Sequence, residues 1–197
     1  MTRVGWGILL VFLVVIGLFA LMVRNGGGPG GPHTATGPAP RVAPAAAAMP
    51  GGGGLIIPVA GMTPEKLSDT WGDARGDGAR QHHAIDIMAP RGTPVLAAAA
   101  GRVEKIFESR DGGHTIYIRR ADPAWQDYYA HLDSYAPGIR EGVAVSAGQQ
   151  IGQVGSTGDA SPEAPHLHYE IHRMAPGDGW WNGSEINPYP ILHGLNR

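Results

Sequence analysis

Apolar and polar positions divide the chain into three parts. Residues 4–23 form an unbroken apolar run without a charged side chain, and residues 25–54 consist mainly of Gly, Pro and Ala. From residue 55 onward, short apolar runs alternate with Gly, Pro and Asp, which is typical of strands joined by turns. The pattern predicts an N-terminal transmembrane anchor over residues 1–24, a flexible linker over residues 25–54 and one folded domain over residues 55–197.

The first apolar run is long enough to cross a membrane. As a helix, residues 4–23 would span a hydrocarbon core of about 30 Å. A cleavable signal peptide usually has a shorter apolar region with a small-x-small motif close behind it, whereas that motif lies far downstream here, at Ala46–Ala48. We therefore expect an uncleaved, single-pass anchor in the inner (cytoplasmic) membrane. Arg3 and the α-amino group nearly balance Arg24, so the expected periplasmic side of the domain depends on the function argued below.

The second part is predicted to be a tether. Residues 25–54 contain too few large apolar side chains to offset the entropy that ordering them would cost. The stretch shows no heptad pattern, so we expect no coiled coil between the anchor and the domain.

The third part is predicted to consist of short β-strands. The segment 114–120, "HTIYIRR", alternates its residues between two faces, as a strand does. A helical period is visible only over one or two turns, near Pro64–Ser68 and Pro123–Gln126. The expected strands lie within residues 93–109 (two strands, broken near Gly101), 114–120, 127–135, 143–158 and 166–173. Short strands at this spacing predict a mainly β domain, an antiparallel sandwich or barrel-like fold.

Composition excludes several classes of function. The chain has Cys 0, so it can form no disulfide, thiolate metal site or cysteine nucleophile. The formal charge is -2, and residues 1–54 hold three arginines but no acidic residue, so the folded part is mildly acidic and offers no nucleic-acid footprint. A biotinyl or lipoyl carrier needs a lysine at a hairpin tip, but the two lysines are Lys66 and Lys105, and Lys105 lies inside an expected strand.

Histidines are the most informative polar residues of the domain. Residues 166–172 read "HLHYEIH", and the period of two in a strand places three histidines and Glu170 on one face. Upstream, "HHAIDI" separates His82 and Asp86 by four positions, so in an extended segment they face the same way while His83 points away. His131 lies in a further expected strand, "YYAHL".

Two imidazoles and one carboxylate form a suitable ligand set for catalytic zinc, which keeps its fourth position for water. His82, Asp86 and one of the strand histidines could supply that set. Additional histidines nearby could accept a proton and stabilise a developing oxyanion. No HExxH motif is present, so the glutamate base of many zinc proteases is missing. The residues therefore favour a hydrolytic zinc site, although spacing alone does not choose among His166, His168 and His172.

Four motifs, taken together, resemble the M23 metallopeptidases of the lysostaphin and LytM type. They are "RQHHAIDIMAPRGTPVLAAAAGRV", "YYAHL", "GQQIGQVGSTG" and "APHLHYE", in that order, and the resemblance covers residues 58–188. It implies a small antiparallel β domain with its site in a groove. It also implies the metal ligands His82, Asp86 and His168. By the same resemblance, His131 and His166 are the catalytic pair that assists the water and stabilises the tetrahedral intermediate.

Three residues near these motifs need separate interpretation. Ala84 stands where the family usually has glycine, which is tolerable at negative φ and costly at positive φ. Glu170 either orients a ligand histidine or is a solvated strand residue. His172 lies beyond the motif, and we expect it at the rim of the groove or facing solvent, without a role at the metal.

The resemblance and the predicted anchor together favour a membrane-anchored zinc endopeptidase. Its substrate would be the peptide cross-links of peptidoglycan, and its partners would be the stem peptides and the membrane. The alternative is a non-catalytic regulator of the same fold that activates another cell-wall hydrolase. Such regulators typically lack ligands or catalytic histidines, whereas all five residues are present here, and the predicted tether offers no coiled coil for recruiting a partner.

Overall fold

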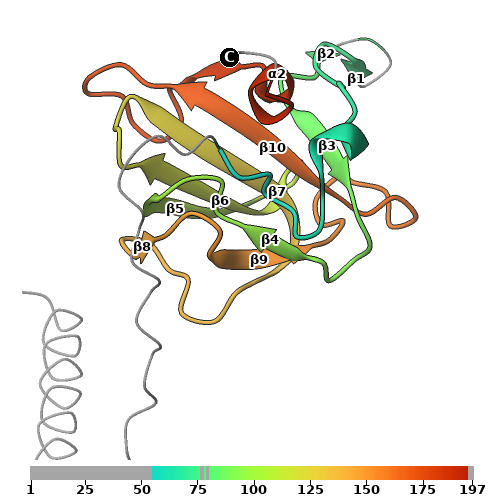
Figure 1. Ribbon diagram of the computed structural model, residues 1–197, viewed down its shortest axis with the longest axis horizontal. Coiled ribbons are helices and arrows are strands. Elements are labelled where there is room, and N and C mark those ends of the chain that lie inside the picture. Colours follow the sequence, from blue (N-terminus) through green and yellow to red (C-terminus); the bar gives the residue numbers. More distant parts are fainter. Residues whose placement is uncertain (1–54, 76–77, 79, 195–197) are drawn as a thin grey trace, which may run out of the picture. The chain divides into compact units, whose positions relative to one another are not determined.

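A computed structural model describes residues 55–75, 78 and 80–194 (Figure 1). The anchor predicted over residues 1–24 and the linker predicted over residues 25–54 lie outside these residues. Within the described part of the chain, no helix combines the length and the apolar character that crossing a membrane requires.

The described residues form short strands, two short helical segments and turns. Every strand pairing among them is antiparallel, so the prediction of a mainly β, antiparallel domain is confirmed. In chain order the elements are the 3-10 helix η1 (Pro64–Lys66), β1 (Ala74–Arg75), β2 (Arg80–Gln81), β3 (Ile85–Met88), β4 (Pro94–Leu96), β5 (Gly101–Ser109), β6 (Gly113–Arg120), β7 (Trp125–Tyr135), β8 (Ala144–Val145), β9 (Gln150–Val154), β10 (His166–Arg173), β11 (Ser184–Ile186) and the helix α2 (Pro188–Leu192).

Two helical details differ from the expectation. The helical turn expected at Pro123–Gln126 is wrong, because the Asp122 carboxylate accepts from the N–H of Ala124 and the Asp122 carbonyl from that of Trp125, which closes a turn into β7. Helix α2 was not expected. Its N-cap is Asn187, whose side chain accepts from the N–H of Tyr189 at 2.9 Å.

One sheet carries most of the domain, and its strands β11, β10, β7, β6, β5 and β8 follow one another in space (Figure 1). Strand β10 has two partners along one edge, because residues 166–169 pair with β3 and residues 171–173 pair with β11. The β3–β10 register places Asp86 directly opposite His168. Strand register thus brings two distant motifs to one point of the sheet.

The two faces of the sheet differ in chemistry. On the core face, β10 presents Leu167, Tyr169 and Ile171, and β6 presents Ile116 and Ile118, all of them fully buried. The opposite face of β10 carries the histidines and Glu170. Burial of the apolar set stabilises the domain by the hydrophobic effect and leaves the polar set together on the other face.

A β-bulge in β7 breaks the alternation at the site. Tyr129 and Leu132 both lie in the core, so the two residues between them, Ala130 and His131, both line the groove on the other face. His131 has φ 58, the one positive φ among the described non-glycine residues, and its N–H donates to the Gly112 carbonyl at 2.8 Å. The bulge therefore turns toward the groove a side chain that regular alternation would place in the core.

Candidate metal centre

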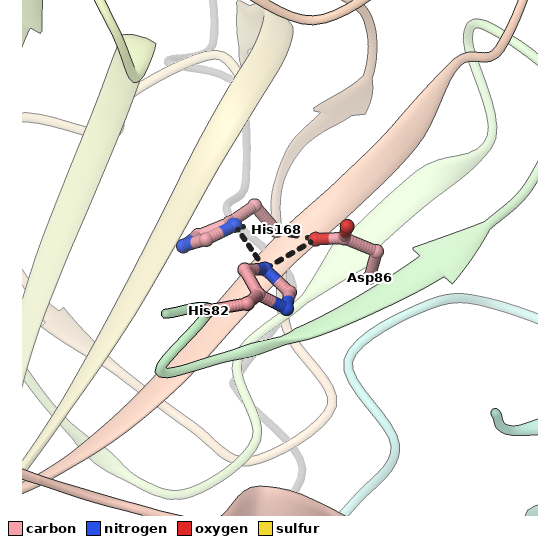
Figure 2. A group of neighbouring side chains, drawn as sticks. All are labelled: His82, Asp86 and His168. Carbon is pink, nitrogen blue, oxygen red and sulfur yellow. Dashed lines mark hydrogen bonds and ion pairs between the residues drawn. The ribbon is translucent and has the colours of Figure 1, made fainter. Parts of the chain in front are cut away.

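Three side chains converge on one point above β3 and β10 (Figure 2). His82 Nε2 lies 3.0 Å from Asp86 Oδ1 and 3.1 Å from His168 Nδ1, and the remaining pair, His168 Nδ1 and Asp86 Oδ1, is 3.2 Å apart. All three side chains are at most 18% exposed. The structure thus brings together His82, Asp86 and His168, and of the strand histidines it is His168 that completes the group.

These atoms have the spacing of ligands around a small ion. Bonds of about 2.0–2.1 Å in tetrahedral geometry place ligand atoms about 3.3 Å apart, close to the separations above. Two imidazole nitrogens and one carboxylate oxygen suit zinc and its neighbours better than magnesium or calcium, which prefer oxygen ligands. The three residues therefore fit a metal ion in chemistry and in spacing.

Neighbouring groups orient each of the three side chains. His82 Nδ1 donates to the Thr70 carbonyl at 2.8 Å, which leaves Nε2 with its lone pair toward the centre. Thr70 also holds Asp86, because its hydroxyl accepts from the Asp86 N–H at 3.0 Å. The second carboxylate oxygen of Asp86 is bonded to Arg75, so only Oδ1 faces the histidines. His168 Nε2 is 2.9 Å from Glu170 Oε1, which leaves Nδ1 for the centre.

Two more histidines stand beside this group. The ring centroid of His131 lies 4.9 Å from that of His166 and 5.5 Å from that of His168. His131 Nδ1 donates to the Thr157 carbonyl at 2.8 Å, and His166 Nδ1 donates to the Ala164 carbonyl at 2.9 Å. A carbonyl can only accept, so each neutral ring keeps its lone pair on Nε2. Each ring can therefore take up a proton at that atom.

Burial and neighbouring charges shift the pKa values of three side chains at this site. Burial opposes the charged form of Asp86, but the adjacent imidazoles of His168 and His82 outweigh it and hold the pKa of that carboxyl well below its ordinary value. Burial also works against a proton on His168, yet the carboxylates of Asp86 and Glu170 raise the pKa of His168 to about 9. Burial lowers the pKa of His131 to about 4, against the hydrogen bond to Thr157, so this ring is neutral at pH 7.

A groove of about 700 Å³ gives access to the centre. All five site residues predicted from the sequence line it. Arg75 and Arg80 of the β1–β2 hairpin contribute to its lining, as does Asp159. Arg80 Nη2 and Asp159 Oδ2 are 3.9 Å apart.

The residues that needed separate interpretation are now placed. Ala84 is fully buried and is not among the residues with positive φ, so alanine fits where the family usually has glycine. Glu170 bonds His168 and His172, which favours the orienting interpretation over a solvated residue. The prediction for His172 is wrong: this side chain is 7% exposed rather than at a solvent-facing rim. His83 points away from the three-residue group and stacks on Trp71.

The sequence offered no sign of three residues that hold the site. Thr70, Arg75 and Thr157 position ligands or catalytic candidates through the contacts above, but each lies outside the four motifs or within a turn motif. Their roles depend on loops and on the β1–β2 hairpin, which lie elsewhere in the chain.

Comparisons with known proteins agree with this geometry. A model of peptidase family M23 matches residues 80–188. The L-Ala–D-Glu endopeptidase of Bacillus subtilis is 38% identical over 147 residues, which are 72% of this chain and 44% of that protein. A peptidoglycan DD-endopeptidase of Vibrio cholerae is 38% identical over 92 residues, 47% of this chain and 20% of that protein. This chain thus covers less than half the length of these curated relatives.

Solved structures share the fold. The catalytic domain of the antimicrobial peptidase lysostaphin from Staphylococcus simulans superposes with a TM-score of 0.54 at 30% identity, and the match covers 64% of this chain and 91% of that domain. The resemblance stated from the four motifs is therefore confirmed. Because the family model matches more than half of the chain, over residues 80–188, the chain belongs to peptidase family M23.

Proposed function

We propose that this chain is a zinc-dependent endopeptidase that hydrolyses the peptide cross-links of peptidoglycan. The observation that carries the proposal is the convergence of His82 Nε2, Asp86 Oδ1 and His168 Nδ1 within 3.2 Å of one another in the lining of one groove. Membership of family M23 supports peptidase activity. Relatives named as peptidoglycan and L-Ala–D-Glu endopeptidases support the substrate class.

In this proposal His82, Asp86 and His168 hold the zinc ion. The ion, when bound, would polarise the scissile carbonyl and lower the pKa of a water molecule beside it. Arg75 keeps the second oxygen of Asp86 occupied, so the carboxylate offers a single ligand atom. Thr70 holds His82 and Asp86 in register through its carbonyl and its hydroxyl.

His131 and His166 carry the proton chemistry. Their rings lie beside the ligand group, and His166 Nε2 is 3.8 Å from Asp86 Oδ1. At this position one of the two rings can accept a proton from the attacking water. Once protonated, the same nitrogen can donate a hydrogen bond to the oxyanion of the tetrahedral intermediate or return the proton to the leaving amine. The carbonyls of Thr157 and Ala164 hold the two rings in the required tautomer.

Cellular position is part of the proposal. The apolar run over residues 4–23 and the Gly/Pro/Ala-rich residues 25–54 suit an enzyme tethered to the inner membrane with its domain in the periplasm. Such a tether would keep the enzyme close to the wall that it cuts.

The alternative of a non-catalytic regulator is less well supported. A regulator needs neither a complete ligand group nor two histidines with free nitrogens beside it, yet both are present around one groove. A regulator of this kind would bind a second cell-wall hydrolase and leave purified peptidoglycan intact.

Digestion of purified peptidoglycan by the full chain tests the proposal. Wild type should contain about one zinc per chain and release muropeptides, which mass spectrometry identifies together with the bond that is cut. His168→Ala should lose both the metal and the activity. His131→Ala should keep the metal and lose about 10²–10⁴-fold in turnover, the usual contribution of general acid–base catalysis. His114→Ala, at a strand histidine outside the group, is the matched control. A metal-free wild type, or equal digestion by His168→Ala, would rule out the enzyme.

A further inference from the structure

We propose that His172 is a positioning residue for the metal centre, which it influences through Glu170 and the ligand His168. The inference rests on the proposed function in one respect only, because it takes His168 to be a metal ligand. It assigns a role to a side chain that lies outside the four motifs.

One carboxylate joins two histidines along β10. Glu170 Oε1 is 2.9 Å from His168 Nε2, and Glu170 Oε2 is 2.5 Å from His172 Nε2. Side chains at alternate positions of a strand are about 6.6 Å apart, so a carboxylate midway between two imidazoles can reach both. Each oxygen of Glu170 therefore has its own imidazole, and the carboxylate has little freedom to rotate.

A second contact fixes His172 itself. His172 Nδ1 is 3.3 Å from the side-chain oxygen of Gln126, which is fully buried on β7. The orientation of that amide is determined, because its nitrogen donates to Glu104 at 2.8 Å. Glu104 in turn accepts two hydrogen bonds from Arg119, at 2.8 and 3.0 Å. His172 therefore has an oxygen acceptor at each ring nitrogen, and the network runs from β5 to the metal ligand on β10.

Aromatic rings cover the His172 end of this network, where that side chain is 7% exposed. Tyr128 stacks on His172 with the ring centroids 6.4 Å apart and the planes at 22°, and its centroid lies 6.0 Å from that of His168. Tyr117 packs on Tyr128 with the ring centroids 4.5 Å apart. Hydrogen bonds in such a low-dielectric setting are stronger than in water and hold their groups in one arrangement.

Stability of the sheet alone does not require this many buried polar groups. Apolar side chains of similar volume at these positions would often be as stabilising or more so. The network ends on the one imidazole nitrogen of His168 that does not face the metal centre. Hydrogen bonds at that position fix the tautomer and ring orientation of a ligand histidine, and their loss typically costs about 10–100-fold in metal affinity.

Substitutions of His172 that differ in reach give a sharp test. A glutamine amide nitrogen reaches about as far as the histidine Nε2 and can still donate to Glu170, whereas an asparagine amide reaches only as far as Nδ1. In the full chain, measured by competition with a chromophoric chelator, His172→Asn and His172→Phe should bind zinc at least about 10-fold more weakly than wild type. His172→Gln should recover most of that loss.

Cobalt substitution supplies a second readout, because the visible absorption of bound Co²⁺ follows the geometry of its ligands. His172→Phe should shift those bands and His172→Gln should restore them. The matched control is His114→Phe, on β6 and outside the network. Like His172, His114 has a carboxylate nearby, because its Nε2 lies 3.6 Å from Glu108 Oε1. This control should bind zinc and cobalt as wild type does.

A double-mutant cycle with Glu170→Gln tests whether His172 acts through Glu170. Once Glu170→Gln has weakened zinc binding, His172→Phe should add little further loss. The inference is overturned if the losses of zinc affinity from His172→Phe and Glu170→Gln are independent and multiply. It is also overturned if a folded His172→Phe binds zinc as tightly as wild type does. If His172→Phe does not fold, equal affinity of His172→Asn and His172→Gln would overturn it as well. These readouts need no substrate, so a wild type that digests peptidoglycan while the variants bind zinc equally would refute this inference and leave the proposed function intact.

Discussion

The backbone at His131 predicts that glycine is more stable than alanine at this position, which is the reverse of the usual order within a strand. Its φ of 58 lies in the left-handed region, which costs a non-glycine residue about 1–2 kcal/mol. Glycine is free of that cost but normally weakens a strand by about 0.5–1 kcal/mol relative to alanine. His131→Gly and His131→Ala both remove the imidazole and its hydrogen bond to Thr157, so their difference isolates the backbone. We expect His131→Gly to be the more stable of the two by about 0.5–1 kcal/mol.

Urea unfolding of the two variants, with metal removed by a chelator, measures this difference. The control is Ala130→Gly, at the neighbouring position, where φ is not positive and where glycine should destabilise by at least about 0.5–1 kcal/mol. Both His131 variants should lose turnover alike. If His131→Ala proves as stable as His131→Gly, the bulge carries no strain. The idea that the fold accepts a backbone cost in order to present this imidazole would then be wrong.

Two further predictions concern metal and core. Removing zinc with a chelator should lower the thermal unfolding midpoint of the wild type. Adding zinc back at 100 times its Kd should raise the free energy of unfolding by about 2.7 kcal/mol. His168→Ala should show neither change. Asp127→Ala should destabilise the domain by about 3–5 kcal/mol, because Asp127 is fully buried and its loss removes the ion-pair partner of Arg120, which is 12% exposed. Tyr169→Phe removes only one hydrogen bond to that carboxylate and should cost about 1.5–3 kcal/mol. Denaturant unfolding compares the two core variants, and an Asp127→Ala as mild as Tyr169→Phe would contradict the buried ion pair.

Local pattern in the sequence was sufficient for much of the fold and for part of the site. Side-chain direction in a strand depends only on the residue's own backbone, so "HLHYEIH" already predicted that His166, His168, Glu170 and His172 share a face. The same reasoning predicted that His82 and Asp86 face the same way. Short apolar runs between turn residues correctly predicted an antiparallel β domain, because strand and turn propensities are also local.

Other features followed only from the tertiary structure, because they depend on residues far apart in the chain. Spacing did not choose among the strand histidines, whereas the β3–β10 register sets His168 against Asp86. Alternation along β7 would have turned His131 into the core, and the bulge reverses this through the distant carbonyl of Gly112. His172 was expected near solvent, yet Tyr117, Tyr128 and Gln126 from neighbouring strands cover it. Period and propensity are properties of a few consecutive residues, whereas register, bulges and burial arise where separate strands meet. The candidate metal centre lies at such a meeting point.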